Sequence, residues 1–250
     1  MVFGPTIFIS FLLCVGLPAW GLGYLALLAR PSGLPAPNDV EWYPIGNLVM
    51  WCGIISAVVV FGLINYGGED NLRSALRGGL ERMFKVKSFA LNETELNRLV
   101  EFMVIVLPPT AAVFTTLTNV LNLWLAGRIV TVSGRLRRPP PDIPAMQLPS
   151  YAPLLTGGAL VGSLLPGMVG KAALTIAAAL LMIYALLGFA VLHHVTRGMN
   201  ARMLMLGGAY VSVMVLGWPI LLMILLGLTD TVLDFRGRVA GRRGPPTPSI

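Results

Sequence analysis

Four polar side chains lie within one long apolar segment and could line a path through a membrane. Thr115, Thr118, Asn119 and Asn122 follow i, i+3, i+4, i+7 spacing, which places side chains on one face of an α-helix. Polar groups surrounded by lipid must find partners. These four residues are therefore candidates for binding a small molecule or an ion between helices. The same groups could instead form hydrogen bonds between helices that hold a bundle together, and the sequence leaves both interpretations open.

A second group of polar residues lies at the ends of apolar runs. His193 and His194 end one run, and Asp230 and Asp234 follow another. Two histidines and two aspartates could bind a metal ion if they met at one membrane face. Adjacent histidines point in different directions on a helix, so we predict no metal site and no cofactor. Asp230, Asp234 and Arg238 are spaced four apart, which predicts solvated ion pairs on an interfacial helical extension.

Sequence signatures of enzymes are incomplete or missing. The segment that ends at Gly170 and Lys171 resembles the end of a phosphate-binding loop. However, Leu165 stands where that motif needs a glycine, and Ala172 stands where it needs a hydroxyl. The chain has no GxSxG, CxxC or HExxH motif. We therefore predict that the protein is not an enzyme and has no catalytic residues.

The composition indicates that lipid surrounds much of the chain. Hydrophobic residues make up 56% of it and charged residues 12%, with a mean hydropathy of +0.78. Soluble domains carry about 25% charged residues. The net charge is +7, but lysine and arginine lie at the ends of apolar runs, which suits anionic lipid headgroups rather than nucleic acid. The bilayer is thus the predicted partner, and a bacterial inner membrane the predicted location.

Apolar runs of about 20 residues predict an all-α, polytopic transmembrane helix bundle, because that length crosses the hydrocarbon core. We expect one domain over residues 1–238 and a disordered tail over 239–250. Gly158 and Gly162 form a GxxxG pair that predicts close helix packing. Prolines at 18, 108 and 219 are expected to kink their helices. The six predicted spans cover residues 3–29, 45–66, 99–127, 151–169, 172–193 and 203–228.

Two linker segments carry helical signals. Residues 69–87 repeat leucines at helical spacing among charges, which predicts an amphipathic helix lying in the interface. Asn92 and Glu95 form a capping-box pattern that predicts a helix leading into the third span. Glu101 is then expected at the interface rather than inside the membrane. The distribution of lysine and arginine favours a cytoplasmic C-terminus.

Several local phrases resemble one bacterial family. They are LPAWGLGY at 17–24, EWYP at 41–44, NLWLAGR at 122–128, SGRLRRP at 133–139, GLTD at 227–230 and DFR at 234–236. Together they resemble the YybS-like predicted membrane proteins, a domain of unknown function, in its α-proteobacterial form. The resemblance implies a distant similarity to the substrate-binding (S) components of energy-coupling-factor transporters. Members usually have about two spans before the segment matching 17–24, so either the start is misassigned or this chain lacks them.

Two functional hypotheses follow. The first is a transport-related membrane subunit that binds a small molecule between helices, suggested by the polar face at 115–122, the kinking prolines and the resemblance. The second is a non-transporting membrane scaffold or assembly factor that docks a protein partner or anionic lipid. The amphipathic segment 69–87 and the basic loop at 135–138 suggest the second.

Overall fold

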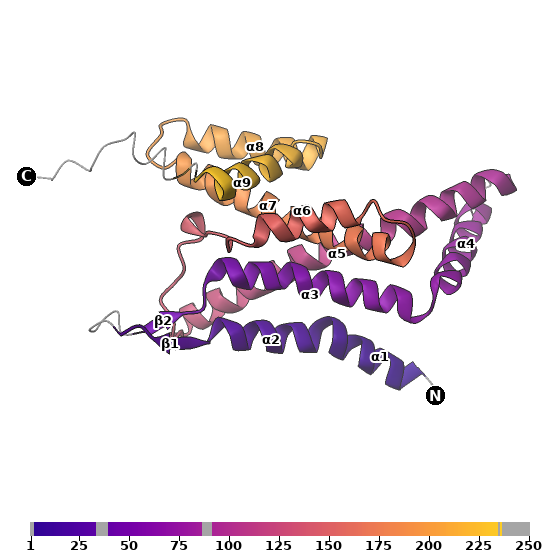
Figure 1. Ribbon diagram of the computed structural model, residues 1–250, viewed down its shortest axis with the longest axis horizontal. Coiled ribbons are helices and arrows are strands. Elements are labelled where there is room, and N and C mark those ends of the chain that lie inside the picture. Colours follow the sequence, from indigo (N-terminus) through magenta and orange to yellow (C-terminus); the bar gives the residue numbers. More distant parts are fainter. Residues whose placement is uncertain (1–2, 34–39, 87–91, 235, 237–250) are drawn as a thin grey trace, which may run out of the picture.

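The computed structural model describes residues 3–33, 40–86, 92–234 and 236, and almost all of them are helical (Figure 1). The all-α prediction is confirmed. Two short strands, β1 (Ala29–Pro31) and β2 (Val40–Trp42), form an antiparallel hairpin. The helices are α1 (Phe3–Phe11), a π-helical turn (Leu12–Gly16), α2 (Leu17–Ala26), α3 (Ile45–Tyr66), α4 (Glu69–Val86), α5 (Glu93–Val132), a 3-10 turn (Ile143–Ala145), α6 (Ala152–Gly162), α7 (Gly167–Val195), α8 (Arg202–Leu216) and α9 (Ile220–Leu233).

Four helical stretches in the described residues are long and apolar enough to cross a membrane. They are Ile7–Ala26, α3, α5 and α7. The apolar helices α6, α8 and α9 have 11, 15 and 14 residues. Each is shorter than the ~20 residues that a crossing needs. The membrane character predicted from composition is therefore compatible with the structure, while the number of crossings depends on how these short helices are arranged.

Two predicted spans are each divided by a turn. The segment 151–169 breaks after α6 at residues 163–166, and the segment 203–228 breaks at residues 217–219. Gly167 and Gly217 have φ angles of 76° and 73°, in the left-handed region that glycine adopts at low cost. Pro166 and Pro219 occupy the N-cap positions of α7 and α9, because proline is tolerated where a helix starts but not inside it.

Helix α7 lies at the centre of the bundle and packs against α3, α5, α6 and α9 (Figure 1). Its largest fully buried side chains are Leu180, Ile183, Tyr184, Leu187 and Val191. In contrast, α1, α2 and α8 expose most of their large apolar side chains. A soluble protein would bury such residues, so these outer helices present the surface expected to face lipid.

Glycine allows α9 to cross α7 at close range. A Cβ atom on Gly188 would overlap the backbone of Met223, and a Cβ on Gly227 would overlap the carbonyl of Tyr184. Backbone atoms cannot move aside as a flexible side chain can. Both positions therefore require glycine for this contact, in the way that small residues let membrane helices approach.

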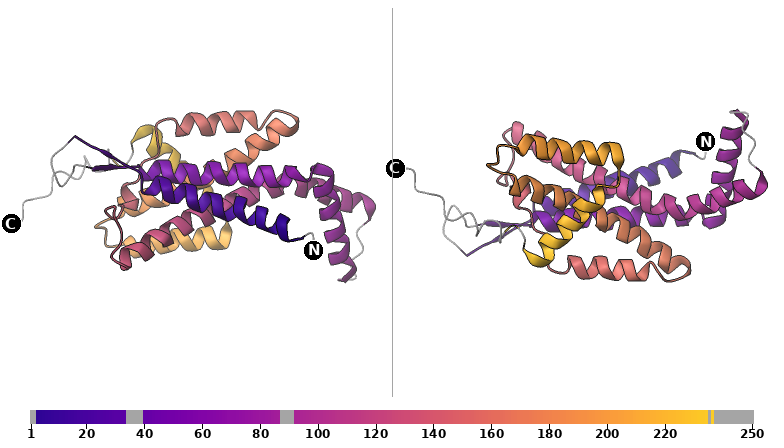
Figure 2. Two further views of the ribbon diagram at one scale, coloured as in Figure 1. Left: turned by 90° about the horizontal axis from the view of Figure 1, so that it is seen from below. Right: turned by 90° about the horizontal axis from the view of Figure 1, so that it is seen from above.

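The molecule has two distinct ends. The basic end contains the β1–β2 hairpin, the loop 133–151, the α7–α8 connection and the end of α9 (Figures 1 and 2). The arm end contains α4, the start of α5 and the α6–α7 turn. Helix α8 runs away from the basic end and α9 returns towards it, and their connecting turn lies only part of the way along the bundle. Helix α1 lies towards the arm end, and α9 ends at the basic end.

Helix α4 and the beginning of α5 pack together as a two-helix arm. Leu80 on α4 and Leu96, Val100 and Val104 on α5 form a separate buried cluster. The predicted capping box at the start of α5 is confirmed, since Asn92 and Glu95 exchange side-chain to backbone hydrogen bonds. The amphipathic helix forms over Glu69–Val86, but its apolar face packs on α5 of the same chain, where the sequence predicted a lipid surface.

Candidate functional site

The predicted polar face of α5 is divided between a helix contact and the outer surface. Asn119 Nδ2 donates a hydrogen bond to Ser56 Oγ on α3 at 3.0 Å. The Ser56 hydroxyl is fully buried and donates to the carbonyl of Cys52 at 2.6 Å. This chain of hydrogen bonds joins α5 to α3. It engages the Asn119 amide, the group that a ligand would otherwise bind.

The other members of this face point elsewhere. Thr118 and Asn122 are exposed, and Thr118 Oγ1 donates to the carbonyl of Phe114 at 2.8 Å within its own helix. Thr115 is half-buried. Thr116, which the spacing argument left out, is instead the buried threonine and donates to the carbonyl of Ala112. The structure does not gather the four residues around a common space, and their role in ligand binding stays a prediction.

The two glycines predicted for helix packing differ in their surroundings. A Cβ on Gly162 would lie 3.1 Å from the Cβ of Ala173, so α6 approaches α7 closely there. Gly158 has nothing within 4 Å of the position of its Cβ. Among the described glycines, the closest approaches between the backbones of two helices occur instead at Gly188 and Gly227, which do not form a GxxxG pair within one helix. No signal in the sequence paired those two positions.

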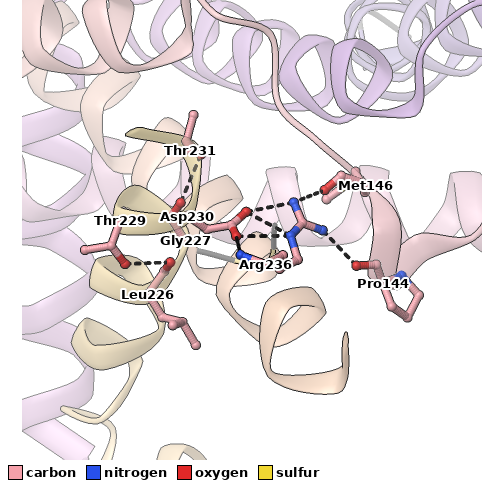
Figure 3. Close-up of polar contacts among 8 residues, drawn as sticks. All are labelled: Pro144, Met146, Leu226, Gly227, Thr229, Asp230, Thr231 and Arg236. Carbon is pink, nitrogen blue, oxygen red and sulfur yellow. Dashed lines mark hydrogen bonds and ion pairs between the residues drawn. The ribbon is translucent and has the colours of Figure 1, made fainter. Parts of the chain in front are cut away.

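A buried ion pair at the basic end is the most highly connected polar site in the described residues. Arg236 Nη2 lies 2.7 Å from Asp230 Oδ2, and Arg236 Nε donates to both carboxylate oxygens at 3.0 and 3.1 Å. The side chains are only 8% and 4% exposed. The other side of the guanidinium donates to the carbonyls of Pro144 and Met146, both at 2.7 Å (Figure 3).

The local backbone makes this pairing feasible. Asp234 ends α9 in the left-handed conformation, with a φ angle of 46°. Aspartate tolerates this conformation better than most residues. The backbone N–H of Arg236 then reaches Asp230 Oδ1 at 3.1 Å. The prediction of solvated pairs at four-residue spacing is wrong for Asp230, because its partner is Arg236 and the pair is buried; Arg238 lies outside the described residues.

These contacts tie the loop 133–151 to three other elements at the basic end. Arg236 binds its carbonyls, and Arg197 after α7 donates to the Asp142 carboxylate at 2.8 Å. Arg197 lowers the pKa of Asp142 through this hydrogen bond. Arg138 donates to the carbonyl of Ala26 at the end of α2 at 3.3 Å. This loop therefore fixes the ends of α2, α7 and α9 relative to one another.

The histidines take part in contacts within and beside α7. His193 Nδ1 lies 2.9 Å from the carbonyl of Phe189, and its ring meets Tyr210 of α8 edge-on at 5.9 Å. Tyr210 also stacks on Phe189 with centroids 4.7 Å apart. Within the described residues, no three histidine, cysteine, aspartate or glutamate side chains gather as metal ligands would. This aromatic cluster is instead the contact that holds α8 on α7.

An exposed network of ion pairs covers the arm end. Glu69 at the start of α4 contacts Lys171 of α7 at 2.6 Å and Arg73 at 2.6 Å. Arg73 also reaches Glu101 of α5 at 3.0 Å, so Glu101 lies in a solvated network. The hydrogen bond from Lys171 lowers the pKa of Glu69. A second set on the arm joins Arg77 to Glu81 and Glu93.

The described residues form one groove worth noting, and it lies on the surface of α2 rather than between the central helices. Its volume is about 450 Å³, and its walls are Ala19, Trp20, Gly23, Tyr24, Leu27 and Leu28.

Comparison with known proteins adds no relative: no family model, no curated protein and no solved structure matches the chain. The resemblance to YybS-like membrane proteins stays a prediction.

Proposed function

We propose that this chain is a non-transporting, multi-pass scaffold of a bacterial inner membrane, and that the α4–α5 arm is its docking surface for a protein partner. The observation that carries the proposal is the length and packing of the arm. Helix α5 has 40 residues and is about 60 Å long at 1.5 Å per residue. The hydrocarbon core is only about 30 Å thick, so a large part of α5 extends beyond it.

The arm is built as a rigid extension. Its buried cluster of Leu80, Leu96, Val100 and Val104 gives it an apolar core apart from the membrane-spanning bundle. Ion pairs from Glu69 to Lys171 and from Arg73 to Glu101 fix it to α7 and α5. Spanning a bilayer requires none of these features. A preorganised surface binds a partner at lower entropic cost, which favours docking as the purpose of the arm.

We further propose five crossings and one re-entrant hairpin in place of six spans. The crossings are α1–α2, α3, α5, α6 with the segment before it, and α7; α8 and α9 enter and leave at the basic end. Among the described residues the basic end then holds eight arginines and four acids, whereas the arm end holds six basic and six acidic residues. The positive-inside rule places the basic end in the cytoplasm and the arm on the opposite side.

Site-specific photocrosslinking in membranes tests the docking proposal. A photoreactive amino acid at Asp70, whose side chain is fully exposed on the arm, is expected to capture one defined protein. The matched control is the same amino acid at Gln147, which is exposed at the basic end. Equal capture at both positions, or none at Asp70, would contradict an arm-specific partner.

Two charge reversals sharpen this test without breaking the arm. Arg82 and Arg98 are exposed, and neither pairs with a carboxylate in the described part of the chain. Arg82→Glu and Arg98→Glu are expected to weaken capture at Asp70 while leaving the melting temperature in detergent unchanged. Full capture by both variants would count against an electrostatic role for the arm surface.

A transport-related subunit is the second candidate, and the interrupted α8–α9 hairpin favours it. Broken helices within the membrane often surround substrate sites in transporters. A thermal-shift screen against vitamins and metal ions tests this candidate. A ligand-induced shift that Asn119→Leu and Asn122→Leu both abolish would replace the scaffold proposal with transport; no shift across the panel would dismiss transport.

A further inference from the structure

The groove on α2 combines an apolar surface with aromatic side chains. Trp20 and Tyr24 stack with ring centroids 6.3 Å apart and remain 72% and 61% exposed. Gly23 forms the floor between them and has nothing within 4 Å of the position of its Cβ. Leu27 and Leu28 extend the groove to the end of the helix. Exposed tryptophan and tyrosine near a helix end are typical of the membrane–water interface.

A guanidinium lies at the end of this groove. Arg138 Nη1 donates to the carbonyl of Ala26, one residue before Leu27, at 3.3 Å. The side chain is half-buried, and no carboxylate pairs with it among the described residues. Burial lowers the pKa of Arg138, as expected for a desolvated cation without an anionic partner. One carbonyl satisfies one of its five N–H donors.

The surrounding loop adds positive charge. Arg135 and Arg137 are exposed on the same short segment, and neither has an acidic partner in the described chain. By contrast, Arg30 nearby pairs with Glu41 at 2.8 Å. Arg138, which contacts the end of α2, thus belongs to a segment whose cations have unused donors, and an anion of matching geometry would complement them.

We propose that this groove binds an anionic phospholipid of the surrounding bilayer, with an acyl chain along Trp20, Gly23 and Leu27 and the phosphate on Arg138. The planar guanidinium can donate two parallel hydrogen bonds to two phosphate oxygens, whereas a lysine ammonium acts as a point charge. The apolar walls suit an acyl chain, and the site is separate from the arm. The cytoplasmic leaflet, where the basic end is placed, carries the anionic lipids of the membrane.

Native mass spectrometry of the purified protein tests this site, with phosphatidylglycerol and phosphatidylcholine of the same acyl chains as probes. The wild-type chain is expected to retain one phosphatidylglycerol and to bind it about tenfold more tightly than phosphatidylcholine. Both lipids carry a phosphate, but the choline cation of phosphatidylcholine cancels its negative charge and is repelled by the nearby arginines. Arg138→Gln is expected to remove that preference. Arg128→Gln, which changes an exposed arginine outside the groove, is the charge control and should keep it.

A second pair of variants tests the groove and does not depend on Arg138. Gly23→Leu fills the floor of the groove and is expected to lower retention of both lipids about tenfold. Gly21→Leu lies on the same helix, also has open space at its Cβ and does not line the groove, so it should behave like wild type. Equal lipid retention by the two leucine variants would overturn the site, and so would equal loss of preference in Arg138→Gln and Arg128→Gln.

Discussion

Two ion pairs, one at each end of the molecule, hold their charges in opposite ways. At the basic end, Asp230 and Arg236 are 4% and 8% exposed, and each of the three guanidinium nitrogens of Arg236 has an acceptor. At the arm end, Glu69 and Lys171 are each 36% exposed, and their partners are spread over a solvated network. A desolvated pair depends on complete hydrogen bonding, whereas water can replace either partner of an exposed pair.

This difference indicates what each end contributes. The buried pair fixes the end of α9 to the loop 133–151, so it positions a short hairpin that cannot be held by spanning the membrane alone. The exposed network orients the arm on the bundle while leaving its outer surface charged.

The largest effect is expected from Asp230→Ala. It leaves the guanidinium of Arg236 buried without its counter-charge, which typically costs about 3–5 kcal/mol. Reversible unfolding in detergent measures the loss. The double variant Asp230→Ala with Arg236→Met should recover part of it, because no buried charge remains. A cost for Asp230→Ala no larger than for Glu69→Ala would remove the distinction between the two ends.

Gly188→Ala tests the contact that brings α9 into position for the pair. Its Cβ would overlap the backbone of Met223, and overpacking of this kind costs about 1–3 kcal/mol. Gly158→Ala is the matched control, since nothing lies within 4 Å of its Cβ. Thermal unfolding of the two variants should differ clearly. Similar melting temperatures would show that the close approach of α7 and α9 is not needed.

Asn119→Leu probes a polar contact of intermediate strength in the middle of the bundle. Losing the hydrogen bond to Ser56 should cost about 0.6 kcal/mol and at most about 1.7 kcal/mol, the average and the maximum for such contacts between membrane helices. Asn122→Leu removes an exposed amide and should leave stability unchanged. If both variants unfolded like wild type, the amide of Asn119 would be available for a role other than packing.

The smallest effect concerns Glu69. Its pKa lies below the ordinary value of 4.5 because of Lys171, so the ion pair stabilises the folded state above pH 4.5 and is lost as pH falls through the lowered value. Glu69→Gln should reduce the acid sensitivity of the arm and change stability at pH 7 by less than about 1 kcal/mol. Thermal unfolding between pH 7 and pH 3 measures both. A stability difference between wild type and Glu69→Gln that grows as the pH falls from 7 to 3 would contradict the assignment.

Local sequence patterns predicted much of this fold. Hydropathy identified the long apolar helices α3, α5 and α7, and Asn92 with Glu95 marked the start of α5, because these signals lie within one segment. The breaks at Gly167 and Gly217 were missed, since glycine and proline within an apolar run are compatible with a kink as well as a turn. Hydropathy alone does not decide between the two.

Contacts between segments could not be predicted from the same patterns. Ser56 and Asn119 are 63 residues apart, and Arg236 meets carbonyls that lie about 90 residues before it. The spacing of Asp230, Asp234 and Arg238 pointed to a continuing helix, but α9 ends at the left-handed Asp234. The groove on α2 went unpredicted too, because its residues read as an ordinary apolar span until Arg138 is placed beside Ala26.

The most direct test of the account asks on which side of the membrane each end lies. Cysteines placed at Asp70, at Ser150 and after Ile250, in a chain with Cys14 and Cys52 replaced by alanine, can be labelled with an impermeant thiol reagent. We predict that the Asp70 position reacts in intact cells, while Ser150 and the appended cysteine react only after the membrane is opened. Reaction of Ser150 and the appended cysteine from opposite sides would contradict a re-entrant α8–α9 hairpin and the two-ended architecture with it.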